Sequence, residues 1–236
     1  MRRTTVPATV LATILLLASA PLASAGEGTS VTLRADGPVQ VEVGPFYGAD
    51  FTAGSGTITV QATDVGGRVT PLPPHDRLQI DATVRSGGRE YAVKVRRVMV
   101  DDPLGRHGTW WGVGLGVEHH GRSGIGTDEL PEVPAALAAF GLGDVSVDGR
   151  VVAVGVPVHV MAADEGLPGR LELDVGDPEL GAVPGLPDGH LRVVWADYEG
   201  EVPQGARRAR YAGGIAVLVL LLAAALWLNR RERVEA

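Results

Sequence analysis

Apolar and polar positions alternate in short runs through most of this chain, and Gly, Pro and Asp interrupt the runs every few residues. Alternation with a period of two predicts an all-β fold rather than βαβ units, because successive side chains on a strand point to opposite faces. Strands are expected at Ser30–Leu33, Val39–Val43, Gly56–Ala62, Leu78–Arg85, Glu90–Val100, Trp110–His119, Asp144–Val147, Arg150–Met161, Gly169–Val175 and His190–Trp195. Short strands of this number are typical of a sandwich or a barrel.

Turn and helix signals complete the predicted fold. The segments 86–89 and 147–150 contain Gly-Gly and Asp-Gly pairs, which tolerate positive φ and predict tight hairpin turns. Pro134–Phe140 has Pro near its first turn and Gly141 at its end, which predicts one short helix. We therefore expect a sandwich or barrel-like β-domain that carries one short helix.

Two apolar segments stand at the ends of the chain. The first, Ala8–Ala23, follows two arginines and leads into an Ala-Ser-Ala sequence, which predicts a cleavable secretory signal over residues 1–25. An uncleaved anchor is the alternative, and it would leave the following domain on the same side of the membrane. The second, Tyr211–Leu228, would be about 27 Å long as a helix at about 1.5 Å per residue, which predicts a transmembrane helix.

These segments predict a single-pass protein of the cell membrane. We expect a β-rich extracytoplasmic domain at residues 26–199, a stalk at 200–210, the transmembrane helix at 211–228 and a cytoplasmic tail at 229–236. A sorting tail that is later removed has the same plan and stays an alternative. Small residues in the helix, such as Gly213 and Gly214, would allow close packing against a membrane-protein partner.

Composition narrows the partners of the expected domain. Acidic side chains outnumber basic ones two to one between residues 26 and 206, which argues against nucleic acid, because binding to phosphate needs a basic face. The chain has no cysteine, so the domain is held together by its core and offers no thiolate to a metal. Lys94 is the only lysine among 21 basic residues, a bias typical of a bacterium with a GC-rich genome.

Enzyme motifs are weak throughout. Strict alternation would place Trp111, Val113, Leu115, Val117 and His119 on one face of their strand, and three glycines on the other, without the spacing of a dinucleotide fingerprint. The loop that follows has Ile125 where a nucleophile elbow needs glycine, so Ser123 is interpreted as a loop residue. Asp76 beside His75 resembles an acid/base pair but has no nucleophile with it. We expect a non-enzymatic protein.

Histidine and methionine are the residues that suggest chemistry. His159 and Met161 lie two apart on one strand face, and imidazole with thioether suits a soft ion such as copper(I). His119 and His120 are adjacent, so a strand would send their rings to opposite faces unless it ends there. These four residues are the candidate ligands for copper or zinc, with His107 and Glu118 as auxiliaries. Ordinary packing of Met161 and the histidines is the alternative.

The segment His159-Val160-Met161 resembles the end of the copper motif in periplasmic chaperones of the PCuAC type, which are β-sandwiches. The resemblance covers these three residues, and neither Met1 nor Met99 stands where that motif has its other methionine. Two functions follow as hypotheses. The first is a membrane-anchored binding or accessory module that contacts a membrane partner. The second is an extracytoplasmic metal-handling domain.

Overall fold

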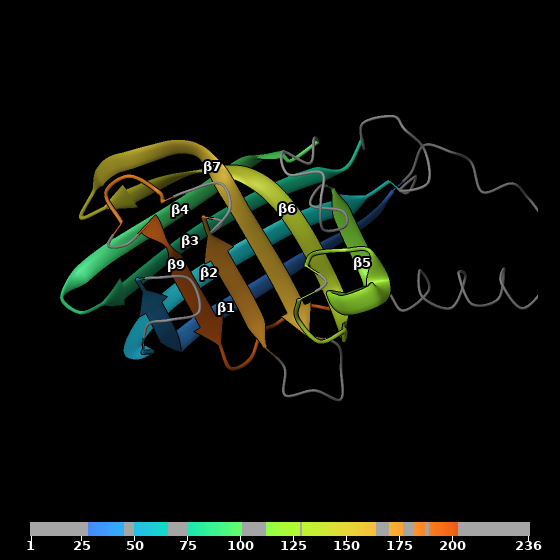
Figure 1. Ribbon diagram of the computed structural model, residues 1–236, viewed down its shortest axis with the longest axis horizontal. Coiled ribbons are helices and arrows are strands. Elements are labelled where there is room, and N and C mark those ends of the chain that lie inside the picture. The colour runs from blue at the N-terminus through green and yellow to red at the C-terminus, as the bar shows by residue number, and fades with distance from the viewer. Residues whose placement is uncertain are drawn as a thin grey trace, which may run out of the picture.

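The computed structural model describes residues 28–44, 50–65, 75–100, 112–127, 129–163, 170–176, 182–186 and 189–202 (Figure 1). The strands in this part of the chain are β1 (Thr29–Val43), β2 (Thr52–Asp64), β3 (Arg77–Ser86), β4 (Arg89–Val98), β5 (Val113–His119), β6 (Val133–Val147), β7 (Arg150–Ala163), β8 (Leu171–Val175) and β9 (Leu191–Trp195). The all-β prediction is confirmed. The expected strands Ser30–Leu33 and Val39–Val43 are both parts of β1.

The strands close into an eight-stranded antiparallel barrel. Their order is β4-β3-β2-β1-β9-β8-β7-β6, and β4 also pairs with β6, which joins the two edges of the sheet. In Figure 1, β6, β7 and β9 lie across β1, β2 and β3, as the tilted strands of a closed barrel do. Closure leaves none of these eight strands as a bare edge.

A ninth strand, β5, extends one end of the barrel. The second half of β6 pairs with β4 and its first half pairs with β5, from Val113 opposite Ala139 to His119 opposite Val133. Backbone hydrogen bonds from Met99 N to Phe140 O and from Phe140 N to Gly112 O join the two halves. Strand β5 therefore continues the line of β4 along β6, beyond the point where the barrel closes.

The barrel interior is filled by apolar side chains from every strand. Trp195 is the largest fully buried side chain, and its Nε1 donates to Gly56 O at 3.1 Å. Alternating positions supply the rest, including Leu33, Val41, Ile58, Val60, Ile80, Val95, Leu115, Leu137, Val160, Leu173 and Val193. Since the chain has no cysteine, this core carries the stability of the barrel. Side chains at the alternate positions face outward, and the candidate site is built there.

The predicted helix at Pro134–Phe140 is wrong, because this segment is the first half of β6. Its alanines are buried between β5 on one side and β7 on the other. Small side chains suit a strand that is covered on both faces, and this packing overrides the helix preference of alanine. The described residues contain a 3-10 turn at Gly121–Ser123 and no α-helix.

Both predicted hairpin turns are confirmed. Gly87 and Gly88 have φ of 58° and 78°, and Asp148 and Gly149 have φ of 51° and 76°. A left-handed pair at both central positions matches the twist of the flanking strands. These turns connect β3 to β4 and β6 to β7.

The predicted secretory signal at 1–25, most of the stalk, the transmembrane helix at 211–228 and the tail lie outside the described residues. Among the residues that the structure describes, no helix has the length and apolar character needed to span a bilayer. The membrane topology therefore stays a prediction.

Candidate functional site

A glycine in β5 turns the end of this strand toward the outer face of the barrel. Val113 and Leu115 belong to the interior core, whereas Val117 packs against Met161 and two alanines of β6 on the outside. Between them Gly116 has a φ of +55°, which interrupts the alternation. The expectation of one face for Val113, Leu115, Val117 and His119 was therefore wrong, and His119 accompanies Val117 to the outer face.

The backbone at His120 brings its ring back beside His119. His120 has φ of 65° and ψ of −177°, a region that residues other than glycine rarely adopt. Three hydrogen bonds hold it: His120 N to Ile125 O at 2.7 Å, Ser123 N to His120 O at 3.2 Å and Gly121 N to Thr127 O at 3.0 Å. The ring centroids of His119 and His120 are consequently 3.6 Å apart. On a regular strand, adjacent side chains point to opposite faces and could not share an ion. The turn at His120 removes this obstacle, because it places the two rings side by side.

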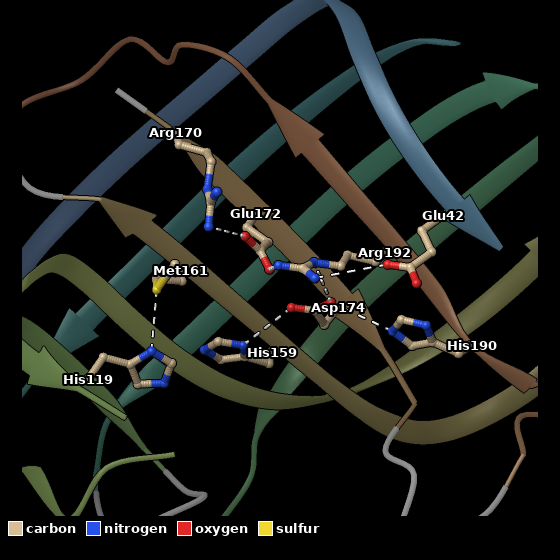
Figure 2. Close-up of polar contacts among 9 residues, drawn as sticks. All are labelled: Glu42, His119, His159, Met161, Arg170, Glu172, Asp174, His190 and Arg192. Atoms are coloured by element: carbon tan, nitrogen blue, oxygen red, sulfur yellow. Dashed lines mark hydrogen bonds and ion pairs between the residues drawn. The ribbon is translucent and has the colours of Figure 1, made fainter. Parts of the chain in front are cut away.

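Strand β7 supplies the other two candidate ligands from its outer face. Val160 and Ala162 point into the core, so His159 and Met161 point away from it. The Nδ1 atom of His119 lies 3.3 Å from the sulfur of Met161, and the rings of His119 and His159 are 4.8 Å apart (Figure 2). Phe140 stacks on His159 with centroids 4.7 Å apart. The structure thus brings together all four predicted ligands, His119, His120, His159 and Met161.

The turn after β5 closes tightly over two of the rings. A Cβ atom at Gly126 would lie 2.7 Å from Nε2 of His119 and 2.8 Å from Nδ1 of His120. Only glycine leaves room for both imidazoles, and its φ of +75° also favours glycine. The loop Gly121–Thr127 is therefore shaped around the histidine pair.

Burial favours the neutral form of the His120 ring. Burial of the ring, together with the charge of nearby His159, lowers the pKa of His120 to about 4. His119 is fully buried, and buried ring nitrogens at His120 Nδ1 and His159 Nε2 have no hydrogen-bond partner. Neutral imidazole with a free nitrogen is the form that binds metals. Among the described residues, however, no three His, Asp or Glu side chains are arranged to hold a metal ion, so a site here requires the thioether of Met161.

The two auxiliary ligands do not join this group. His107 lies outside the described residues. Glu118 pairs with Pro134 in the regular part of β5, so alternation sends its side chain to the face opposite His119. Among the candidate ligands, His119 contacts Met161, and His120 and His159 each lie beside His119.

A buried charged network adjoins the histidines, and the sequence interpretation missed it. Asp174 on β8 lies between two imidazoles, with its Oδ2 3.7 Å from His159 Nδ1 and its Oδ1 3.6 Å from His190 Nε2 (Figure 2). Arg192 on β9 contacts Glu172, Asp174 and, at 3.9 Å, Glu42 on β1. The signal was present as charged residues alternating with apolar ones in β8 and β9. That pattern does not show which strands become neighbours in the sheet.

The carboxyl groups of this network differ in their pKa. Burial alone would raise the pKa of Asp174, but its contacts with His159 and His190 and the charge of Arg192 outweigh burial and lower it. Burial and the charge of Asp174 raise the pKa of Glu172, although Arg192 and Arg170 oppose this. Asp174 is consequently the carboxylate that stays charged beside His159.

Other residues considered as catalytic have structural roles. Asp76 accepts hydrogen bonds from the backbone N–H groups of Val65 at 2.9 Å and Val113 at 2.8 Å, which fixes the start of β5. The hydroxyl of Ser123 donates to Ile125 O within the 3-10 turn region, as expected of a loop residue. Both groups are engaged by backbone and stabilise the loops around the site.

Comparison with protein-family models, with curated proteins and with solved structures finds no match for this chain.

Proposed function

We propose that this protein is a membrane-anchored, extracytoplasmic metal-handling domain that binds a soft metal ion through Met161 and the histidines of the outer face. The observation that carries the proposal is the 3.3 Å contact between His119 Nδ1 and Met161 Sδ, made by residues on β5 and β7 in a buried setting. An ion with bonds of about 2.0 Å to nitrogen and about 2.3 Å to sulfur would see these two atoms at an angle of about 100°. This angle suits a metal without displacement of either strand.

The donor set favours copper(I) over zinc. Thioether and imidazole are soft or borderline donors that suit copper(I), whereas structural zinc usually takes four ligands that include thiolate or several imidazoles. The chain has no cysteine, and its described residues hold no ready set of three His, Asp or Glu donors. At the bent angle set by His119 and Met161, copper(I) needs at least a third ligand, which His159 supplies.

The arrangement favours holding or transferring the ion rather than catalysis. His119 is fully buried and Met161 nearly so, while His120 and His159 are partly exposed. An incoming ion would therefore meet His120 or His159 before the buried pair. Export by residues 1–25 and anchoring by 211–228 would place this site outside the cytoplasm, close to the membrane.

Titration of the full chain with copper(I) under reducing conditions, against a chromophoric chelator, tests the proposal. We expect one equivalent to bind, and silver(I) to compete as a redox-silent substitute. Met161→Leu keeps the volume of the side chain and removes the sulfur donor. Since loss of an outer-shell partner alone costs about 10–100-fold in metal affinity, loss of this ligand should cost at least about tenfold.

Met99→Leu is the matched control, because Met99 is also buried but belongs to the junction of β4 and β5. It should leave copper(I) affinity unchanged. Absence of stoichiometric binding to the unmodified chain, or equal losses in the two variants, would reject the metal proposal.

A binding or accessory module is the second candidate, and exposed valines on β7 favour it. Val151 and Val154 are 56% and 71% exposed, in a strand whose neighbouring valines are partly buried. A partner protein that covers a large exposed apolar side chain buries apolar surface area. If copper(I) does not bind, charged substitutions at these two positions, followed by crosslinking in the membrane, test this function.

A further inference from the structure

The orientation of the His159 ring decides which of its nitrogens is available to the proposed metal site. Each imidazole has two nitrogens, and a hydrogen bond at one of them decides which is left to bind a metal. His159 presents Nδ1 to Asp174 Oδ2 at 3.7 Å, whereas its buried Nε2 has no hydrogen-bond partner. Nε2 is therefore the nitrogen left for an ion, while Nδ1 faces a carboxylate.

The carboxylate itself is well supported on the outer face of β8. Asp174 pairs across the sheet with His159 on β7 and with Arg192 on β9, so its position is set by two ladders. Arg192 Nε lies 3.6 Å from Asp174 Oδ1, on the side away from His159 Nδ1. This leaves Oδ2 directed at the imidazole, as Figure 2 shows.

Asp174 shares this network with one guanidinium group that contacts several carboxyl groups. Arg192 contacts Glu42, Glu172 and Asp174, whereas Arg170 is half exposed and contacts Glu172 at 2.9 Å. Asp174 therefore presents a carboxyl group to His159, and a cation bound on the other side of that ring would be attracted to its negative charge.

Resting on the proposed function, we infer that Asp174 is a positioning residue for the metal site: it holds Nδ1–H of His159, directs Nε2 toward the ion shared with His119 and Met161, and supplies the negative charge that favours a cation there. Carboxylate, imidazole and metal in this order are a recurring device for fixing the tautomer and raising the basicity of a ligand. The 3.7 Å separation closes to a hydrogen bond with a shift of less than about 1 Å.

Asp174→Asn in the full chain tests the inference. We expect silver(I) and copper(I) affinity to fall about 10–100-fold, the cost of losing an outer-shell partner. X-ray absorption should still show sulfur bound to the metal, because Met161 and His119 are untouched. Asp81→Asn is the control: this carboxyl group also pairs with an arginine, Arg96, but it lies on β3 between β2 and β4, away from the histidines, so affinity should change less than about threefold.

Nitrogen NMR of the unmodified protein provides a second measurement, which needs no substitution at Asp174. The signals of His159, assigned by comparison with His159→Gln, should show Nδ1 protonated and Nε2 unprotonated, and silver(I) should shift Nε2. A proton on Nε2, or an Asp174→Asn variant that binds as tightly as the unmodified chain, overturns the positioning role. If Met161→Leu still abolishes binding in that case, the proposed function stands; if the unmodified chain binds no metal, both are rejected.

Discussion

The backbone strain at His120 can be measured by substitution of this residue. At φ of 65° and ψ of −177° a residue with a Cβ is strained, and glycine is not. We compare His120→Gly with His120→Ala, since both remove the ring and only the alanine variant keeps the strain. The difference in free energy of unfolding between the two variants therefore isolates the backbone contribution from the lost contact with His119.

The magnitude follows from two opposing effects. A residue held in this sparsely populated region costs about 1–3 kcal/mol. Glycine costs about 0.5–1 kcal/mol relative to alanine, because the unfolded chain gains freedom. The net expectation is that His120→Gly is more stable than His120→Ala by up to about 2.5 kcal/mol, with a midpoint of about 1 kcal/mol, the reverse of the usual order. Ala92→Gly in β4, at a half-buried position with ordinary strand pairing, should instead be less stable than the unmodified protein by about 0.5–1 kcal/mol.

Urea unfolding of the full chain in mild detergent, followed by circular dichroism and tryptophan fluorescence, measures these differences. Silver(I) titration of the same variants should show equally weakened binding, because neither variant has the imidazole of His120. The reasoning fails if His120→Ala is as stable as His120→Gly, since the turn would then carry no strain. Equal metal affinity in both variants and in the unmodified chain would instead remove His120 from the ligands.

Three further predictions concern the same end of the barrel. Gly126→Ala should destabilise more than Gly124→Ala by about 1–3 kcal/mol in urea unfolding, because both have φ near +75° but only the first places a Cβ against the histidine rings; equal losses would show that the ring contact is unimportant. The pKa of His120 is lowered from 6.5 to about 4 in the folded protein. As pH falls from 6.5 to 4, the unfolded chain therefore binds a proton at this ring and the folded protein does not. Unfolding free energy should therefore drop by about 1–2 kcal/mol between pH 6.5 and 4, after allowance for the partly exposed ring, and His120→Gln should remove that part of the decline; parallel pH profiles would contradict it. Asp76→Ala removes the acceptor of two backbone N–H groups and should cost about 2–4 kcal/mol, with faster hydrogen exchange at Val113; unchanged exchange there would show that the carboxylate does not hold β5.

Local sequence patterns were sufficient for the class of fold and for several of its parts. Period-two alternation predicted the strands, and the Gly-Gly and Asp-Gly pairs predicted both hairpins, because these features depend on neighbours in the chain. The choice of His119, His120, His159 and Met161 as one group also came from residue chemistry alone. The helix at 134–140 failed because alanine prefers a helix in isolation, and only burial between β5 and β7 makes it a strand.

What the sequence determined by itself is a β-rich chain with two terminal apolar segments and a shortlist of soft-metal donors. The tertiary structure alone decided that the barrel closes between β4 and β6, and that β5 continues along β6 beyond this closure, where His119 contacts Met161 of β7. It also decided the orientation of the donors, because the positive φ of Gly116 turns His119 outward and that of His120 returns the second ring to the first. Asp174 was not predicted as part of the site for the same reason. Its contact with His159 forms only when β7 and β8 are neighbours, and the sequence of either strand alone does not show which strand it pairs with.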